Sequence, residues 1–409
     1  MTGLQHQRRV VGRNALELAV GAVFAVYVFY LLMLGKEFSP SVAPPWYRDL
    51  GILWDNADFV VGHRQYRSGY FFPPSAYIIA HLFELLGPDL GFRLYLVLQV
   101  IAVGAALWAW ARIIGLYRSA NRSVVTLTTV IVCSFYIQTQ LSMHNANAET
   151  FALVSLALAW RPRTQLSAGL YALSLAIKPY SSAFLLPWMV WCGYRGWVVS
   201  AVLWLLGFYL LLPVVWFGFH DTVALNLQWF GNLVAVSDSN DPGQLSVRAG
   251  LAALLGLPLA NPAVHLGGLV LEAAWGVALA GFFWPTLTRR GAPTAMVGAC
   301  EAAAILLIGL PLGSHQQPSR SLVLIAAALI ITFAVSDARQ PKRLRAILGL
   351  ILAAIGLPVW LIPFSPLYFF MTLPICLLSL AGLAIVRASP TSQAPTPTVP
   401  MEPTGRSSA

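Results

Sequence analysis

Long apolar runs separated by short polar segments make up most of this 409-residue chain. Many of the runs reach the roughly twenty residues that an α-helix needs to cross a bilayer, and the others are shorter or broken by polar groups. The pattern predicts an all-α membrane protein with both termini on one side and about twelve transmembrane helices. Their predicted ranges are 15–35, 92–114, 123–141, 148–160, 165–178, 180–194, 197–217, 263–285, 293–312, 320–336, 345–363 and 366–386.

The longest polar interruption in the apolar part of the chain runs from Asp49 to Pro74 and reads DLGILWDNADFVVGHRQYRSGYFFPP. A connection between two membrane helices needs only a few polar residues, so this density of ionisable and aromatic groups indicates a function beyond connection. We interpret the segment as one wall of an active site. Its ionisable residues include Asp49, Asp55, Asp58, His63, Arg64 and Arg67.

Two short apolar segments fall within the predicted outer loops 36–91 and 218–262. Residues 75–87 (SAYIIAHLFELLG) follow a Pro-Pro turn and carry His81 and Glu84, and residues 246–256 (SVRAGLAALLG) have a helical pattern. Both segments are too short to cross a bilayer. We therefore expect interfacial or re-entrant helices at these two places.

The composition excludes a water-soluble globular protein. Hydrophobic residues make up 58% of the chain and charged residues 10%, and the mean hydropathy is +0.71, whereas soluble domains are typically about 25% charged. The first apolar run is too long for a signal peptide and lacks a small-residue cleavage site, so we expect it to be retained. We expect one transmembrane domain over residues 1–387 and a disordered cytoplasmic tail, rich in Pro, Thr and Ser, over residues 388–409.

The net charge of +10 is explained by where the basic residues lie in the predicted membrane topology, so it does not require nucleic acid as a partner. Most of the lysines and arginines fall in one set of loops, which the positive-inside rule makes cytoplasmic. Those left at the outer face could each contact lipid headgroups, but as a group they favour anion binding. They are Lys36, Arg48, Arg64, Arg67, Arg93, Lys178, Arg248 and Arg320.

Two polar features accompany them at the predicted outer face. The turn 140–149 (QLSMHNANAE) contains His144, Asn145 and Asn147, which suit hydroxyl binding but also an ordinary polar turn with a helix cap. Lys178 precedes Pro179 at the end of a predicted helix. A lysine there suits a phosphate group and suits snorkelling to the surface equally well.

Other polar residues have no single interpretation from the sequence. His315 lies in the short outer loop GSHQQPSR, which also contains Arg320. Glu272 and Glu301 fall within predicted helices, where a carboxylate costs several kcal/mol unless it is paired or protonated. Their partners cannot be assigned.

Motifs of several other catalytic classes are absent from the sequence. There is no Walker loop, no GxGxxG after a strand and no GxSxG elbow. The cysteines show no CxxC spacing, so we expect packing roles and neither a disulfide framework nor a zinc site. They are Cys133, Cys192, Cys300 and Cys376.

A series of short motifs follows along the chain. In order they are Ala57-Asp58-Phe59-Val60-Val61, Phe72-Pro73-Pro74, the turn at 140–147, Ile177-Lys178-Pro179, Gln244-x-Ser246 and the His315 loop. This order of features resembles glycosyltransferase family 87 over most of the chain. The chain differs from the family pattern after the Asp-x-x-Val frame, where Val61 and Gly62 stand instead of the usual tyrosine, and in the histidine loop, which is reduced to His315.

The resemblance implies the GT-C architecture and a transferase that uses a polyprenyl-phosphate sugar. The family includes mycobacterial phosphatidylinositol-mannoside mannosyltransferases and an arabinofuranosyltransferase. We expect an inverting transfer of a hexose, with mannose preferred, to a lipid or glycan acceptor. The enzyme would lie in the bacterial cytoplasmic membrane with its active site on the outer face. The expected partners are the bilayer, the donor and the acceptor, with no nucleic acid and no cofactor beyond the donor.

The resemblance also implies roles for individual residues. Asp58 matches the family's catalytic acidic position and would act as general base, and no residue is assigned to a metal. The expected donor-phosphate ligands are Lys178, His315, Arg320, Arg64 and Arg67. The expected acceptor and sugar ligands are Asp55, His144, Asn145, Asn147, Tyr66 and Gln244.

Other functions remain open on sequence alone. An arabinofuranosyltransferase would share these features, and a lipid or sugar transporter would also have about twelve spans. Transporters usually show paired repeats and charged residues near the bilayer midplane, whereas this chain concentrates charge in the outer loops and shows no matching halves. A noncatalytic assembly partner leaves the three aspartates between residues 49 and 58 unexplained.

Overall fold

The computed structural model describes ten segments of the chain. They are residues 48–66, 72–115, 146–178, 181–237, 247–258, 260–289, 293–312, 325–335, 346–351 and 372–388. Regular structure in these segments is helical throughout, and none of them contains a strand. The expected all-α class is therefore confirmed for the described part of the chain.

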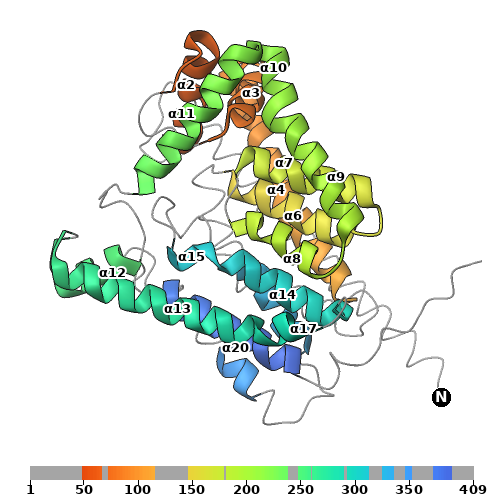
Figure 1. Cartoon of the computed structure of the whole chain (residues 1–409), viewed down its shortest axis with the longest axis vertical. Coiled ribbons are helices and arrows are strands. Elements are labelled where there is room, and N and C mark those ends of the chain that lie inside the picture. The colour runs from red at the N-terminus through yellow and green to blue at the C-terminus, as the bar shows by residue number, and fades with distance from the viewer. Residues whose placement is uncertain are drawn as a thin grey trace, which may run out of the picture.

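The helices form two groups (Figure 1). The first contains α2 (Arg48–His63), α3 (Pro74–Glu84), α4 (Pro88–Ile113), α6 (Asn147–Ala159), α7 (Thr164–Ile177), the 3₁₀ turn η4 (Ser181–Phe184), α8 (Leu185–Trp191), α9 (Arg195–Leu206), the π-helical η5 (Gly207–Leu211), α10 (Leu212–Phe217) and α11 (Phe219–Ser237). The second contains α12 (Val247–Leu255), α13 (Pro262–Thr288), α14 (Ala295–Leu307), α15 (Gly309–Leu312), α17 (Ile325–Val335) and α20 (Thr372–Ala388).

Three of the described helical segments are long and apolar enough to cross a membrane. They are Arg93–Ile113, Arg195–Phe217 and Pro262–Thr288, which coincide with predicted spans. The predicted span 180–194 holds only η4 and α8, which together are too short to cross alone. The predicted spans 15–35 and 123–141 and the tail 389–409 lie outside the described residues. The total of twelve remains a prediction.

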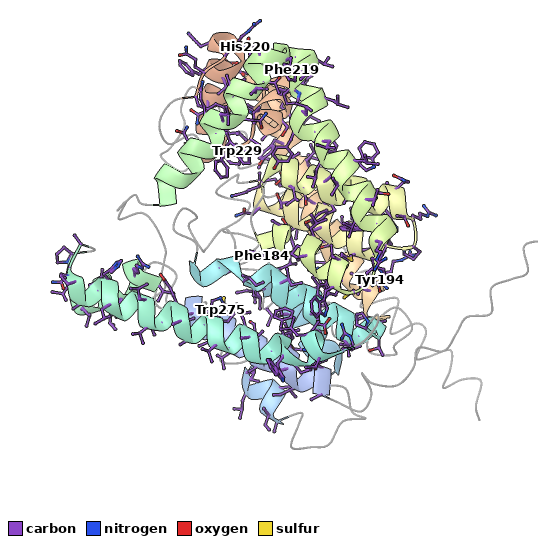
Figure 2. The ribbon with its side chains drawn as sticks, viewed as in Figure 1. Phe184, Tyr194, Phe219, His220, Trp229 and Trp275 are labelled. Atoms are coloured by element: carbon purple, nitrogen blue, oxygen red, sulfur yellow. The ribbon has the colours of Figure 1, made fainter. Side chains whose placement is uncertain are left out.

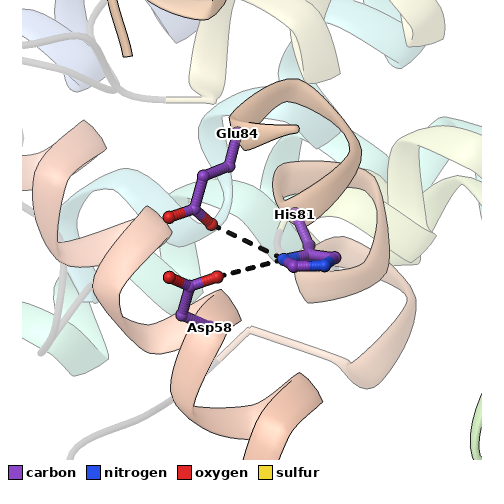
Figure 3. A group of neighbouring side chains, drawn as sticks. All are labelled: Asp58, His81 and Glu84. Carbon is purple, nitrogen blue, oxygen red and sulfur yellow. Dashed lines mark hydrogen bonds and ion pairs between the residues drawn. The ribbon is translucent and has the colours of Figure 1, made fainter. Parts of the chain in front are cut away.

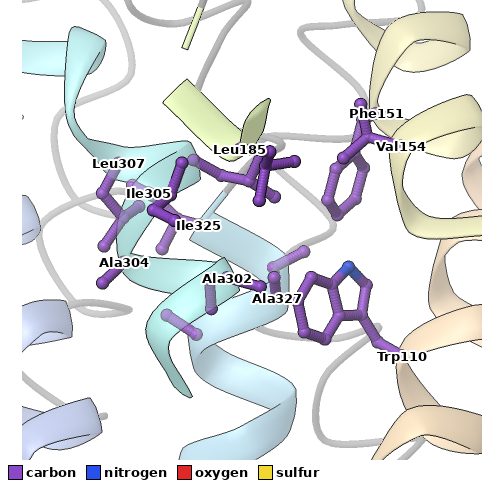
Figure 4. Packing of buried hydrophobic residues seen from close by; sticks show 14 of the residues in the cluster. Trp110, Phe151, Val154, Leu185, Ala302, Ala304, Ile305, Leu307, Ile325 and Ala327 are labelled. Atoms are coloured by element: carbon purple, nitrogen blue, oxygen red, sulfur yellow. The ribbon is translucent and has the colours of Figure 1, made fainter. Parts of the chain in front are cut away.

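A continuous core joins the two groups (Figure 4). Trp110 of α4 and Phe151 of α6 belong to the same buried cluster as Leu185 of α8, Ile305 of α14 and Ile325 of α17. Small side chains at this contact let helix backbones approach closely, as is usual between membrane helices. They include Ala302, Ala304 and Ala327.

Trp275 of α13 is another large residue of this core, and it is fully buried (Figure 2). Its indole nitrogen donates a 3.0 Å hydrogen bond to the carbonyl of Ile308, between α14 and α15. The indole therefore satisfies a carbonyl at the point where α14 ends.

Both intramembrane glutamates have arginine partners. Glu301 is fully buried and accepts hydrogen bonds from Arg289 at 2.8 Å, Thr286 at 2.8 Å and Trp188 at 3.0 Å. Arg387 is also within 3.0 Å of the same carboxylate. The contact joins the C-terminal ends of α13 and α20 to α14. These are ends that the predicted topology assigns to the cytoplasmic side.

Glu272 on α13 binds Arg248 of α12. The Arg248 guanidinium donates two hydrogen bonds, of 2.9 and 2.8 Å, to the two carboxylate oxygens. A Cβ at Gly268 would overlap the Arg248 side chain, so glycine at this position leaves the space that this side chain occupies. The predicted helical pattern at 246–256 is confirmed, and Arg248 has a structural partner.

The segment 36–91 differs from the loop that we expected. Residues 48–63 form one continuous helix, α2, which packs against α3 through Trp54, Ala57 and Val60. The outer segment 218–262 likewise begins with the 19-residue helix α11. The predicted short helix at 75–87 is present as α3. Where the structure describes it, the segment between predicted spans is therefore largely helical, and a helix at 48–63 was not among the predicted elements.

The cysteines that the structure describes are Cys192, Cys300 and Cys376, and all three are buried with free thiols. Packing roles are confirmed for these three. Cys133 lies outside the described residues.

Candidate active site

The end of α2 is fixed to α11. The α2 helix ends at His63, and the next residue, Arg64, has a φ of 54°, in the left-handed region. The Arg64 N–H donates to the Val60 carbonyl at 2.9 Å. This is the usual geometry of a left-handed helix cap, although glycine is the common residue there. The Arg64 side chain binds Asp221 at 2.7 Å. The two predicted outer loops are therefore in direct contact.

Tyr66 adds to this contact. Its backbone N–H donates to the Gln228 side chain of α11 at 2.8 Å, and its hydroxyl donates to the Phe72 carbonyl at 2.9 Å. Burial raises the pKa of the Tyr66 phenol well above its ordinary value, so it remains a hydrogen-bond donor at neutral pH. Tyr66 thus connects the residues that follow α2 to α11 and to Phe72, which precedes α3.

Asp58, His81 and Glu84 form a cluster between α2 and α3 (Figure 3). The His81 Nδ1 atom lies 3.0 Å from Asp58 Oδ1 and 3.5 Å from Glu84 Oε2. The side chain of Asp58 is 52% exposed, that of Glu84 29% and that of His81 20%. A half-exposed carboxylate held by a neighbouring histidine can accept a proton from a bound hydroxyl group.

The same three side chains offer the donor atoms of a cation site. One imidazole nitrogen and one oxygen from each carboxylate lie within 4.8 Å of one another. Nitrogen and oxygen ligands of this kind suit several divalent cations. The sequence analysis assigned no metal ligand, so this grouping was not predicted.

The Pro73–Pro74 turn meets the C-terminal end of α7. The Ser75 hydroxyl donates to the Ala176 carbonyl at 2.9 Å, and the Tyr209 hydroxyl donates to the Leu175 carbonyl at 2.7 Å. Residue 179 is a proline and has no N–H for the carbonyl four residues earlier. Side chains from α3 and η5 therefore satisfy the carbonyls at this helix end. Two of the sequence motifs meet here.

Lys178 follows immediately and is buried, with 1% of its surface exposed. Its ammonium group lies 5.8 Å from the centre of the Phe72 ring and interacts electrostatically with Glu149. The snorkelling alternative is therefore wrong. The Glu149 carboxylate is also buried, and neither of its oxygens has a hydrogen-bond partner within the described part of the chain. Tyr95 and Gln99 of α4 are its other polar neighbours.

An apolar cavity of about 310 Å³ lies beside this buried pair. It follows α4 from Tyr95 to Ala105, which is roughly 15 Å of helix, and Glu149 is part of its wall. Leu98 and Ile101, which also line it, are 40% and 58% exposed, so one side of the cavity reaches the outer surface of the helix bundle. The remaining lining comes from α2, α3, α6 and the end of α7.

The structure brings some of the predicted site residues together. Asp58 lies with His81 at one end of α3, and Lys178 lies near Ser75 at the other end, which is roughly 9 Å away along the helix axis. Asn147 is buried, with 6% of its surface exposed, in the first turn of α6.

Other predicted ligands have different surroundings or are not described. Arg64 is engaged by Asp221, and of Asp55 only the backbone is described, on α2. Asp55 and Asp58 are three residues apart on the helix α2. The predicted ligands outside the described residues are Arg67, His144, Asn145, Gln244, His315 and Arg320.

Sequence reasoning assigned no role to three residues of these clusters. His81 and Glu84 are three residues apart in a short apolar segment, and that spacing places both on one helix face. Glu149 follows the amide-rich turn directly before an apolar run. In each case an ionisable group in an otherwise apolar helix was the available signal.

A model of glycosyltransferase family 87 matches residues 70–311, which is more than half of the chain. The match includes His81, Glu149 and Lys178, and it begins after Asp58. No curated protein and no solved structure matches the chain.

Proposed function

Because this chain belongs to glycosyltransferase family 87, we propose that it transfers mannose from a polyprenyl-phosphate donor to a lipid or glycan acceptor at the outer face of the cytoplasmic membrane. Glycosyltransferase activity follows from the family membership itself. The sugar, the two substrates, the membrane side and the inverting mechanism are our proposal. The protein would be a multi-pass enzyme that takes its donor from the bilayer.

The proposed reaction is a single displacement at the anomeric carbon. The acceptor oxygen attacks this carbon while its proton passes to the Asp58 carboxylate. The bond between the anomeric carbon and the phosphate oxygen breaks, and the electron pair leaves with polyprenyl phosphate. One base is sufficient because phosphate is already a good leaving group. The anomeric configuration inverts.

The observation that best supports this proposal is the Asp58–His81 pair at 3.0 Å, with the Asp58 side chain half exposed. A general base needs an accessible oxygen and a defined orientation, and this carboxylate has both. Its helix, α2, also contributes Trp54 to the wall of the apolar cavity. A base on this helix suits a substrate whose lipid chain enters the bundle nearby.

The cavity suits a lipid chain better than a sugar. Its volume of about 310 Å³ is at the lower end of the range for small-molecule sites, about 300–1,000 Å³, and its lining is almost entirely apolar. We assign it to the first part of the polyprenyl chain. Lys178 lies beside its polar end and would stabilise the donor phosphate, together with His315 and Arg320.

The proposal is tested with purified protein and a donor labelled in the sugar. Polyprenyl-phosphate mannose and a lipid extract from the source membrane should give a labelled product whose new linkage has the opposite anomeric configuration to the donor. The Asp58→Asn protein serves as control and should form little product. Movement of intact labelled donor across proteoliposomes without product would instead identify a transporter. Product with retained configuration would contradict the single displacement.

A further inference from the structure

We propose that His81 is a positioning residue for the Asp58 base. The inference rests on the proposed function, in which Asp58 accepts the proton of the acceptor hydroxyl. In this arrangement the protonated Nδ1 of His81 donates a hydrogen bond to Asp58 Oδ1. That bond fixes the carboxylate and leaves Oδ2 as the oxygen that receives the proton.

The position of the imidazole proton follows from the groups around it. Nδ1 lies 3.0 Å from Asp58 Oδ1 and 3.5 Å from Glu84 Oε2. An ionised carboxylate can only accept hydrogen bonds, so an unprotonated Nδ1 would face two acceptors. Nδ1 therefore carries a proton in both the neutral and the charged form of the ring. Glu84 adds to this preference from the next turn of α3.

The ring is held by the packing of three helices. The His81 ring meets the Trp216 ring of α10 edge to face, with ring centres 6.2 Å apart. Below the cluster, Ala57 and Val60 of α2 are fully buried in the same core as Tyr77 of α3. A donor on one packed helix and an acceptor on another keep their separation, as a positioned catalytic group requires.

Among the described residues, the titratable groups that face the imidazole are Asp58 on α2 and Glu84 on α3. On the α10 side the neighbour is the uncharged Trp216 ring. On α11, Asp221 is engaged by Arg64 at 2.7 Å. In the described part of the chain, the Asp58 carboxylate is therefore the nearest charged group to Nδ1.

The main test compares two replacements of His81. In His81→Asn the side-chain amide nitrogen occupies about the place of Nδ1 and can still donate to Asp58, whereas in His81→Phe no donor remains. We expect His81→Phe to lower kcat by about 10²-fold, which is the order of loss from a misplaced catalytic group, with little change in either KM. We expect His81→Asn to restore most of that loss. Equal loss in both variants would overturn the proposal.

As a matched control, His220→Phe replaces an exposed histidine on α11 (Figure 2). It should leave kcat and both KM values unchanged. A loss of kcat in His220→Phe as large as that in His81→Phe would contradict a specific role for His81.

A double variant separates this inference from the proposed function. If His81 acts through Asp58, adding His81→Phe to Asp58→Asn should cause no further loss of kcat. If Asp58→Asn alone keeps wild-type turnover, the proposed function is refuted, and the positioning role of His81 is refuted with it. If Asp58→Asn is inactive but His81→Phe is not, only the positioning role fails. A different outcome would be that EDTA removes wild-type activity, that Mn²⁺ restores the activity, and that His81→Asn lacks this response to the cation. His81 would then be a cation ligand, and the proposal would be overturned.

Discussion

The buried pair of Lys178 and Glu149 gives a prediction that separates folding from donor binding. We consider Lys178→Met, which removes the ammonium group and keeps most of the side-chain volume. Lys178 is 1% exposed, and the Glu149 carboxylate oxygens are shielded from solvent without a hydrogen-bond partner among the described residues. As an ion pair the two groups compensate each other's charge, so loss of Lys178 leaves the Glu149 carboxylate buried without its counter-charge.

The expected cost is large for a single substitution. Removal of one partner of a buried ion pair typically costs about 3–5 kcal/mol, whereas replacement of both partners by neutral groups of similar size is often close to neutral. We therefore expect Lys178→Met to lower the apparent melting temperature in detergent by about 5 °C or more. The double variant Lys178→Met/Glu149→Gln should recover most of this loss. Melting is followed by the fraction of monodisperse protein after heating.

The double variant also tests the phosphate assignment. It should be folded but lack the cation, so the donor KM should rise by about tenfold or more, which corresponds to about 1.4 kcal/mol, while the acceptor KM changes little. If the melting temperature of the double variant falls by the sum of the decreases in Lys178→Met and Glu149→Gln, the pairing is refuted. An unchanged donor KM in the folded double variant would remove Lys178 from the donor site.

Three further predictions concern the membrane and the cavity. Cysteines placed at Gly62 and at Arg290 should react with impermeant reagents from opposite sides of the membrane, because the first lies in an outer and the second in a cytoplasmic segment of the predicted topology; labelling from one side would contradict it. Ala105→Phe should fill the cavity and raise the donor KM by about tenfold, whereas Ala273→Phe on the exposed face of α13 should not; equal effects would refute the assignment. Glu301→Gln should destabilise the protein by about 3–5 kcal/mol, since it leaves two partly buried arginines without their carboxylate; a melting temperature like that of wild type would contradict this.

The longest helices could be predicted from the sequence because they depend on local composition alone. The segments Arg195–Phe217 and Pro262–Thr288 are apolar for more than twenty residues. The α2 helix was missed because its polar residues were read as a loop. Trp54, Ala57 and Val60 recur at three-residue spacing, and this amphipathic pattern suits a helix that packs on one face.

The pairing of site residues could not be predicted in the same way. Asp58 was selected from the sequence, but its contact with His81 depends on how α2 crosses α3, and residue spacing does not fix that crossing. Lys178 and Glu149 come together only because α6 and α7 form an antiparallel hairpin. The sequence identified which ionisable groups lie in apolar surroundings, and the tertiary packing decided which of them are partners.

The central claim, that Asp58 is the base of a polyprenyl-phosphate sugar transfer, is tested most directly by the single-turnover rate of Asp58→Asn. The assay uses purified protein saturated with labelled donor and acceptor, with donor binding measured separately. General-base assistance is typically worth about 10² to 10⁴ in rate, so the variant should bind donor like wild type and lose that much turnover, while Asp49→Asn and Asp55→Asn lose less. A turnover rate of Asp58→Asn close to that of wild type would contradict the account, and the base would then be sought first at Asp55.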